Sequence, residues 1–322
     1  MTQFIKSREA ILLAALIALI LLVETRFSGF ASPGNLAKVF NDTSILIILA
    51  LGQTLVILTR CIDLSQASNL ALTGMVTAML NAAMPGIPVV GLIAIAVALG
   101  ILMGAFNGIL VWKLDIPPIV VTLGTLTIYR GIIFIVSGGE WVNSHEMSAG
   151  YKAFPRAEFL GLPVMAWICV ATIAGFAILV NRTALGRAFY AVGGNPSASV
   201  YTGIDVGKTR FMAFTIAGGL AGLCGYLWVS RYAVAYTDVA GGFELDIVAA
   251  CVIGGISIAG GLGTVTGAVL GALFLGTIKN ALPVAGVSPF WQMAISGAAI
   301  IIAVAFNRRR EPGRVILKEV AR

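Results

Sequence analysis

Long apolar runs alternate with short polar segments along the whole chain, and this pattern predicts membrane-spanning helices. The run from Ile11 to Val23 is typical, because it is continuous and shows no in/out alternation, which favours a helix over a strand of a barrel. With about 20 residues needed for one span, we expect about ten helices. Their approximate extents are 8–24, 43–60, 65–83, 88–112, 117–137, 163–181, 210–230, 244–259, 263–280 and 289–306.

Two of these spans, 65–83 and 244–259, contain polar residues inside the apolar run. We expect either to be broken or re-entrant, which a membrane tolerates only where protein or water covers the backbone. The predicted fold class is all-α: a polytopic membrane protein in which residues 1–322 form one transmembrane domain.

The composition agrees with this class. Hydrophobic residues make up 59% of the chain and charged residues 11%, and the mean hydropathy is +0.98, which is more apolar surface than one soluble core could hide. The 38 glycines are typical of helices that approach closely in lipid. We expect Gly193-Gly194 and Gly218-Gly219 to be flexible or close-packing points, and packing explains the second pair better.

The distribution of basic residues predicts the orientation, because positive loops stay in the cytosol. With both termini inside, the cytosolic segments hold 14 of the 21 Lys and Arg residues but only 6 of the 14 Asp and Glu residues. The net charge of +7 is spread over loop ends, so no nucleic-acid partner is indicated. The longest polar insert with a basic bias, at about 181–209, then lies in the cytosol, and a loop at about 138–162 lies outside.

No catalytic or metal-binding constellation is present in the sequence. The four cysteines are isolated, which indicates neither a disulfide framework nor a metal site, and His145 is expected to be a solvated loop residue. The segment Gly203–Thr209 has one residue too few between its glycines for a phosphate-binding loop. We therefore expect no enzymatic activity and no cofactor in this chain.

Three groups of residues carry a family resemblance. They are 186–196 with Ala198 and 203–204; 107–111 with 116–126 and 130–131; and 254–264 with Gly267, Gly271 and Asn280. Together they resemble the ribose/xylose/rhamnose/autoinducer-2 family of ATP-binding-cassette permeases. One departure lies in Ile62–Ser68, where Gln66 and Ala67 replace a more usual Val-Gly and put the local packing in doubt.

The resemblance implies a mechanism and a set of partners. A second permease subunit, identical or different, would complete the pathway through the lipid bilayer of the bacterial inner membrane. A periplasmic sugar-binding protein would deliver the solute, and a cytosolic ATPase holding ATP and Mg²⁺ would drive transport. The ATPase-coupling residues expected in 181–209 are Gly186, Arg187, Gly193, Gly194, Asn195, Pro196, Ala198 and Gly203, with a docking helix over 195–201 capped by Asn195 and ended by Gly203. An ordinary structured loop is the alternative.

A sugar pathway should be lined by neutral hydrogen-bonding groups. The candidates are Ser65, Asn69, Thr73, Asn107, Thr122 and Thr125, each of which could instead satisfy backbone carbonyls or bridge helices. Charged groups near spans should be paired: Asp63 with Arg60, and Asp246 with Arg231 or Lys279. The loop 138–162 is either a surface for a transient partner or an interfacial belt in which Trp141 and Tyr151 rest at the headgroups.

Two other functions remain open. A secondary transporter or channel would need a carboxylate relay or discontinuous ion-binding helices, and no acid lies clearly at mid-membrane. An amino-acid permease of the same transporter class is separated from a sugar permease only by the resemblance.

Overall fold

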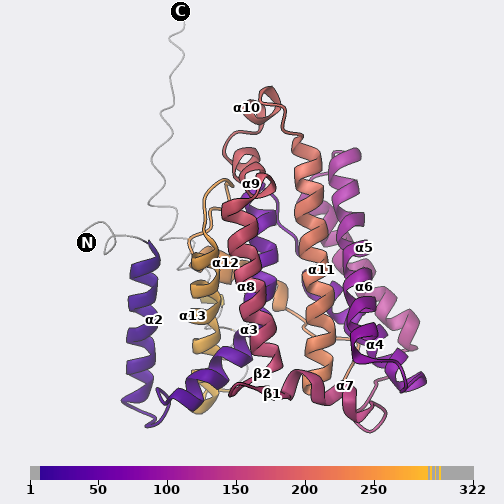
Figure 1. Cartoon of the computed structure of the whole chain (residues 1–322), viewed down its shortest axis with the longest axis vertical. Helices are drawn as coiled ribbons and strands as arrows, with labels where there is room; N and C mark the ends of the chain where they lie inside the picture. Colours follow the sequence, from indigo (N-terminus) through magenta and orange to yellow (C-terminus); the bar gives the residue numbers. More distant parts are fainter. Residues whose placement is uncertain (1–7, 289–290, 292–293, 295–296, 299–322) are drawn as a thin grey trace, which may run out of the picture.

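The computed structural model describes residues 8–288, 291, 294 and 297–298, and within them helices dominate (Figure 1). The longer helices are α2 (Arg8–Glu24), α3 (Pro33–Leu58), α4 (Gln66–Ala83), α5 (Val89–Lys113), α6 (Pro118–Ser137), α8 (Val164–Arg182), α9 (Ala184–Gly194), α11 (Val206–Tyr232), α12 (Phe243–Ile253) and α13 (Val265–Val284). Shorter elements are α7 (Ala149–Ala153), η1 (Phe154–Arg156), α10 (Pro196–Tyr201) and a hairpin of β1 (Glu158–Phe159) with β2 (Leu162–Pro163).

Six described helices are long and apolar enough to cross a membrane: α3, α5, α6, α8, α11 and α13. The predicted class, an all-α polytopic membrane protein, is confirmed. Figure 1 shows the long helices side by side, with α10 at one end of the bundle and α7 at the other. We call these the α10 end and the α7 end.

Most helix boundaries lie within a few residues of those expected, but α3 begins at Pro33 and not near residue 43. The Ser32 hydroxyl accepts a hydrogen bond from the backbone N–H of Asn35, and Pro33 occupies the first turn. This is a strong helix start, so residues 33–42, in which polar and apolar residues are mixed, extend the helix beyond its apolar run.

The two doubtful spans have different outcomes. Residues 66–83 form one unbroken helix, and the non-helical stretch precedes it at 61–65. The second prediction was too long, since α12 ends at Ile253 and a glycine-rich loop occupies 254–264. Eleven residues extend about 16 Å, half the thickness of the hydrocarbon core. The expected helix 289–306 lies almost wholly outside the described residues.

Helix α11 is the centre of the packing and lies against α3, α4 and α5. Gly218 and Gly222 of α11 face Gly100 and Gly104 of α5 so closely that a Cβ on Gly218 would overlap the backbone of Gly100. Such small-residue contacts let two helices approach without side chains between them. The packing role expected for Gly218 is confirmed.

Tyr151 corrects an expectation about the 138–162 loop. Its side chain is fully buried and not at a membrane surface. Its hydroxyl lies 3.1 Å from the Thr77 hydroxyl, its ring meets Tyr226 edge to face, and its carbonyl accepts from Tyr226 and Ser230. The loop folds back into the bundle because these polar groups find partners there.

Candidate functional site

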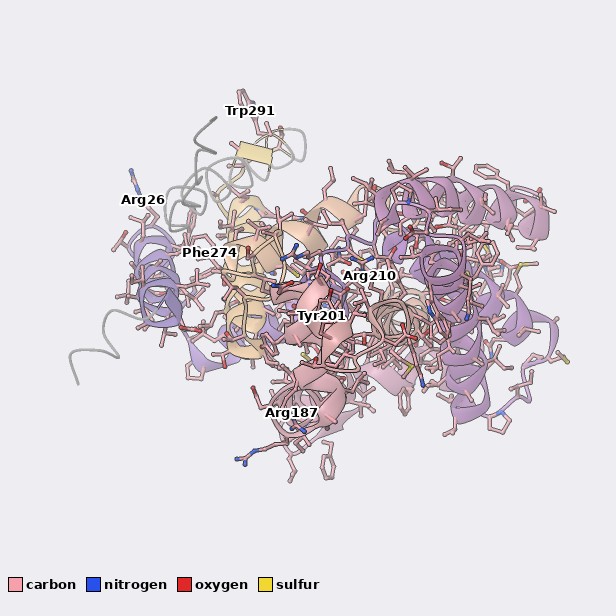
Figure 2. All side chains as sticks on the ribbon, turned by 90° about the horizontal axis from the view of Figure 1, so that it is seen from above. Arg26, Arg187, Tyr201, Arg210, Phe274 and Trp291 are labelled. Carbon is pink, nitrogen blue, oxygen red and sulfur yellow. The ribbon has the colours of Figure 1, made fainter. Side chains whose placement is uncertain are left out.

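The 181–209 segment is built from two helices at the α10 end. Helix α9 starts where the Thr183 hydroxyl accepts from the N–H of Gly186. Phe189 and Val192 are buried against the bundle, whereas Arg187 is exposed and points away from it (Figure 2). The helix is therefore amphipathic and lies on the end of the bundle.

Helix α10 lies beyond α9 and the ends of the long helices, at the tip of the bundle (Figures 1 and 2). The Asn195 side chain accepts from the N–H of Ala198 at 3.0 Å, Pro196 opens the first turn, and Gly203 follows with φ +81°. A helix thus exists at the predicted position with the predicted cap and stop, and its docking role stays a prediction. Val200 is 61% and Tyr201 92% exposed, so α10 presents one aliphatic and one aromatic side chain at its surface.

Three segments that are far apart in the sequence meet at the end of α9. We call this contact the Arg60 junction, and it consists of Leu58–Arg60, Gly193–Gly194 and Gly260–Gly261. The guanidinium of Arg60 donates to the carbonyl of Gly193 at 2.7 Å and to that of Gly194 at 2.9 Å. The N–H of Gly261 donates to the carbonyl of Leu58 at 3.0 Å. The end of α3, the end of α9 and the loop before α13 are thereby bonded together.

Glycine is required at this junction for steric reasons. A Cβ on Gly193 would overlap the carbonyl oxygen of Leu58, and one on Gly261, whose φ is +73°, would lie 2.6 Å from the nitrogen of Gly194. Gly194 has nothing within 4 Å of its Cβ position. The two neighbours Gly193 and Gly194 therefore differ: the first is a close contact and the second is open.

Two more side chains tie the same segments together. The hydroxyl of Tyr190 in α9 donates to the carbonyl of Gly263 at 2.8 Å, and Arg210 at the start of α11 donates to the carbonyl of Thr59 at 3.4 Å. These hydrogen bonds connect α9 to the loop before α13, and α11 to the end of α3.

The expected pairing of Asp63 with Arg60 is wrong. Arg60 bonds to the junction, and the buried Asp63 carboxylate accepts from the N–H and the hydroxyl of Ser65 at 2.8 and 2.6 Å. Asn107 donates to the Ser65 hydroxyl at 2.8 Å, and Thr122 donates to the carbonyl of Ile62 at 3.2 Å. Three of the six pathway candidates, Ser65, Asn107 and Thr122, thus surround the non-helical stretch 61–65.

The other three candidates are buried in helix contacts. Asn69 donates to the carbonyl of Gly100 at 3.3 Å, whereas Thr73 and Thr125 donate to carbonyls of their own helices. The structure brings Asn69 and Thr73 to one face of α4, as their spacing indicated. Contact of any of the six with a solute stays a prediction.

Gln66, which departs from the family pattern, has a partner that the sequence did not reveal. Its side-chain amide lies 2.7 Å from that of Gln53 in α3. The Gln53 amide also lies 3.2 Å from both the backbone N and the backbone O of Asp63. The two buried glutamines therefore hold the stretch 61–65 against α3.

Charged pairs gather toward the α7 end. Asp246 pairs with Lys279, one of its two expected partners, while Arg231 pairs with Asp42. Arg130 donates to the carbonyl of Val239 at 2.6 Å and lies 3.9 Å from Asp238. These pairs connect α12 to α13, α11 to α3 and α6 to the segment before α12.

Apart from Tyr151, the 138–162 loop buries Val142, Met147 and Pro155 and exposes most of its other residues. Trp141 packs on Tyr236 with ring centroids 5.2 Å apart but stays 56% exposed, and His145 is exposed as expected. The backbone N–H of Asn143 donates to Glu146 and lowers the pKa of that carboxyl below its ordinary value. The loop is therefore a surface on which the large apolar side chains of Trp141, Phe159 and Leu160 are exposed.

Comparison with known proteins decides the family. A family model described as "Branched-chain amino acid transport system / permease component" matches residues 35–304. The chain belongs to this permease family. The chain is 37% identical to the autoinducer 2 import system permease protein LsrC of Salmonella typhi, over 96% of this chain and 88% of that protein. It is also 37% identical to the ribose import permease protein RbsC of Escherichia coli K12, over 93% of each chain.

These matches confirm the family expected from the motifs, and the relatives are permease proteins rather than enzymes. No solved structure matches this permease. Sequence reasoning gave Arg60 the wrong partner and did not single out Gln53. An arginine beside a predicted helix end was visible, but its partner lies 133 residues away, and no local pattern indicates such a pairing.

Proposed function

We propose that this permease is the transmembrane subunit of an ATP-driven importer for a monosaccharide. The observation that carries the proposal is α10, a capped helix that presents Val200 and Tyr201 beyond the bundle. It directly follows α9, whose end is bonded to the end of α3 at the Arg60 junction. The relatives named for autoinducer 2 and ribose import support a sugar-like solute. The description of the family model keeps a branched-chain amino acid as the second candidate.

In this proposal the α10 end faces the cytosol and receives the ATPase. The exposed Val200 and Tyr201 enter a groove of that partner, as a short apolar anchor does in a protein interface, while Arg187 lies at the rim. Closure of the ATPase on ATP and Mg²⁺ pulls α10, and the Arg60 junction passes the movement to α3 and to the loop before α13. Nucleotide chemistry is left to the partner.

The surrounding assembly follows from the same orientation. The permease would lie in the bacterial inner membrane with about ten spans and both termini inside. The loop 138–162, with Trp141 exposed, would meet a periplasmic sugar-binding protein, and a second permease subunit would complete the pathway. Ser65, Asn107 and Thr122 around the stretch 61–65, together with Asn69, Thr73 and Thr125, remain the proposed pathway residues at the cytosolic half.

The test is uptake of labelled monosaccharides in cells with and without the ATPase partner. Uptake that requires the partner, and that is lost when Gly194 and Asn195 are both replaced by bulky residues, supports the proposal. Membrane insertion of the variant is checked in parallel, and Gly194→Ala is the matched control because its Cβ meets nothing. Uphill transport by the purified chain alone on an ion gradient would contradict the proposal.

A further inference from the structure

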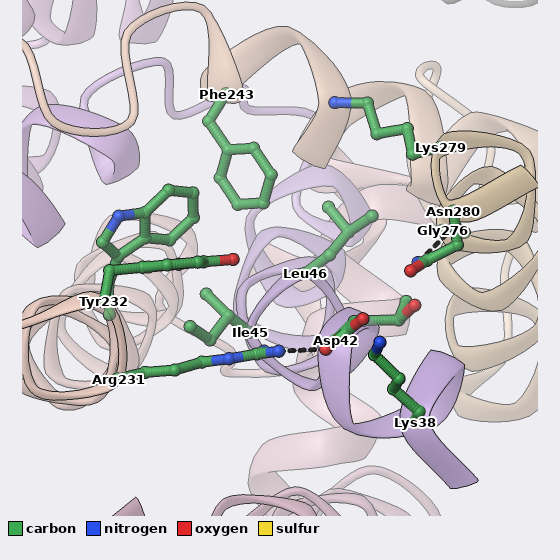
Figure 3. Close-up of a pocket in the computed structure, with 12 residues that line it drawn as sticks. Lys38, Asp42, Ile45, Leu46, Arg231, Tyr232, Phe243, Gly276, Lys279 and Asn280 are labelled. Carbon is green, nitrogen blue, oxygen red and sulfur yellow. Dashed lines mark hydrogen bonds and ion pairs between the residues drawn. The ribbon is translucent and has the colours of Figure 1, made fainter. Parts of the chain in front are cut away.

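A cavity of about 450 Å³ opens near the α7 end, at the opposite end of α11 from the Arg60 junction (Figure 3). It lies between the first half of α3, the last turns of α11, the start of α12 and the second half of α13. Its volume is in the range of small-molecule sites. None of the six pathway residues proposed above lines it.

One side of the cavity is aromatic. Trp228 of α11 and Phe243 of α12 meet edge to face, with ring centroids 5.2 Å apart, and both are only half-buried. The two rings leave aromatic surface open to the cavity. Such a surface suits a sugar ring, whose C–H faces are apolar and whose hydroxyl edges are polar.

The facing side offers hydrogen-bonding groups that the protein leaves unused. Asp42 and Arg231 form an ion pair through one carboxylate oxygen, and the other, Oδ2, accepts no hydrogen bond among the described residues. The side-chain N–H of Asn280 donates to the carbonyl of Gly276 in the same helix, so the side-chain oxygen of Asn280 remains available as an acceptor. The Lys38 ammonium makes no ion pair within the part of the chain described here. The cavity thus presents acceptors and a donor together.

Most of the charges in the lining are compensated. Asp42 pairs with Arg231 and Lys279 pairs with Asp246, and Asp42, Arg231 and the remaining Lys38 ammonium can all bond to hydroxyl groups. From the aromatic pair, the unused polar atoms and the volume, we propose that this cavity binds a neutral polyhydroxylated solute of monosaccharide size. This inference rests on the proposed function, and it assigns the solute's first binding position on the far side of the bundle from α10.

The test first identifies the solute. Uptake by the full assembly is measured for D-ribose, D-xylose, L-rhamnose and autoinducer 2, with D-gluconate as a charged comparison. We expect a neutral compound to be imported. Import of none of these compounds would overturn the proposed function and this inference with it. Import of D-gluconate alone would overturn the neutral class proposed here and leave ATP-driven import standing.

The second step asks whether that compound enters the cavity. Tyr232 is on the rim and 51% exposed, and the four native cysteines are buried, so Tyr232→Cys gives a single site for a membrane-impermeant maleimide. We expect the imported compound to slow labelling of Tyr232→Cys and not of Gly86→Cys, a control at an exposed position between α4 and α5 whose Cβ position is open. Equal labelling of both with and without the compound would overturn the inference.

Variants of the aromatic side complete the test. Trp228→Ala should lower uptake by about tenfold while ATP hydrolysis by the assembly continues, and Trp228→Phe should restore most of it. Phe134→Ala removes an exposed aromatic side chain of α6 that does not line the cavity and should keep normal uptake. Normal uptake by Trp228→Ala, together with labelling of Tyr232→Cys that the compound does not slow, would contradict this inference and leave ATP-driven import standing.

Discussion

The guanidinium of Arg60 lies 2.7 Å from the carbonyl oxygen of Gly193, a residue 133 positions later in the chain. This hydrogen bond joins the end of α3 to the end of α9, directly below the exposed helix α10. It links α9, which leads directly into the proposed docking helix, to the long helix α3.

Replacing Arg60 by Lys should uncouple the permease from its ATPase. The planar guanidinium bonds to two carbonyls at once, whereas an ammonium group at the end of a flexible stem reaches one at best. Loss of a charge-assisted hydrogen bond costs about 1.5–3 kcal/mol, so uptake should fall by about tenfold or more while ATP hydrolysis persists. Uptake and hydrolysis are measured together in reconstituted assemblies. A parallel fall of both would indicate lost assembly instead.

Gly193→Ala and Gly194→Ala should differ sharply although they are neighbours. A Cβ on Gly193 overlaps the carbonyl oxygen of Leu58, and a Cβ on Gly194 meets nothing within 4 Å. We expect Gly193→Ala to abolish uptake and Gly194→Ala to keep it. Uptake and the amount of each variant in the membrane are the measurements. Equal activity of the two variants would show that α9 can move away from α3 without consequence.

Gly218→Val should weaken the whole bundle. Because the backbones of α5 and α11 touch at Gly100 and Gly218, added carbons force the helices apart at a cost of about 1–3 kcal/mol or more. The melting temperature in detergent should drop clearly. Gly175→Ala in α8 is the control, since its Cβ position is open, and it should keep the native melting temperature.

Asp246→Lys should destabilise the contact between α12 and α13, and the double variant Asp246→Lys with Lys279→Asp should recover part of the loss. The pair is only partly buried, with side-chain exposures of 12% for Asp246 and 35% for Lys279, so breaking it should cost about 1–2 kcal/mol rather than the full cost of a buried pair. Thermal unfolding of the two single variants and the double variant gives the coupling energy. Strictly additive effects would mean that the two charges do not interact.

The sequence by itself determined the membrane class, most helix positions and the capped helix α10, because each depends on neighbours within a few residues. Continuous apolar runs have no alternative to helices in lipid, and Asn195-Pro196 specifies a helix start locally. The motifs also placed the chain in its family, since they are read directly from the residue order.

Only the tertiary structure decided which groups meet. Arg60 bonds to Gly193 and Gly194 rather than to Asp63, Gln53 supports Gln66, and Tyr151 is buried between helices instead of lying at a surface. Each of these contacts joins residues whose distance along the chain says nothing about their distance in space. A buried polar group bonds to whichever partner the packing brings within reach, and that choice is made by the helix arrangement, not by the local sequence.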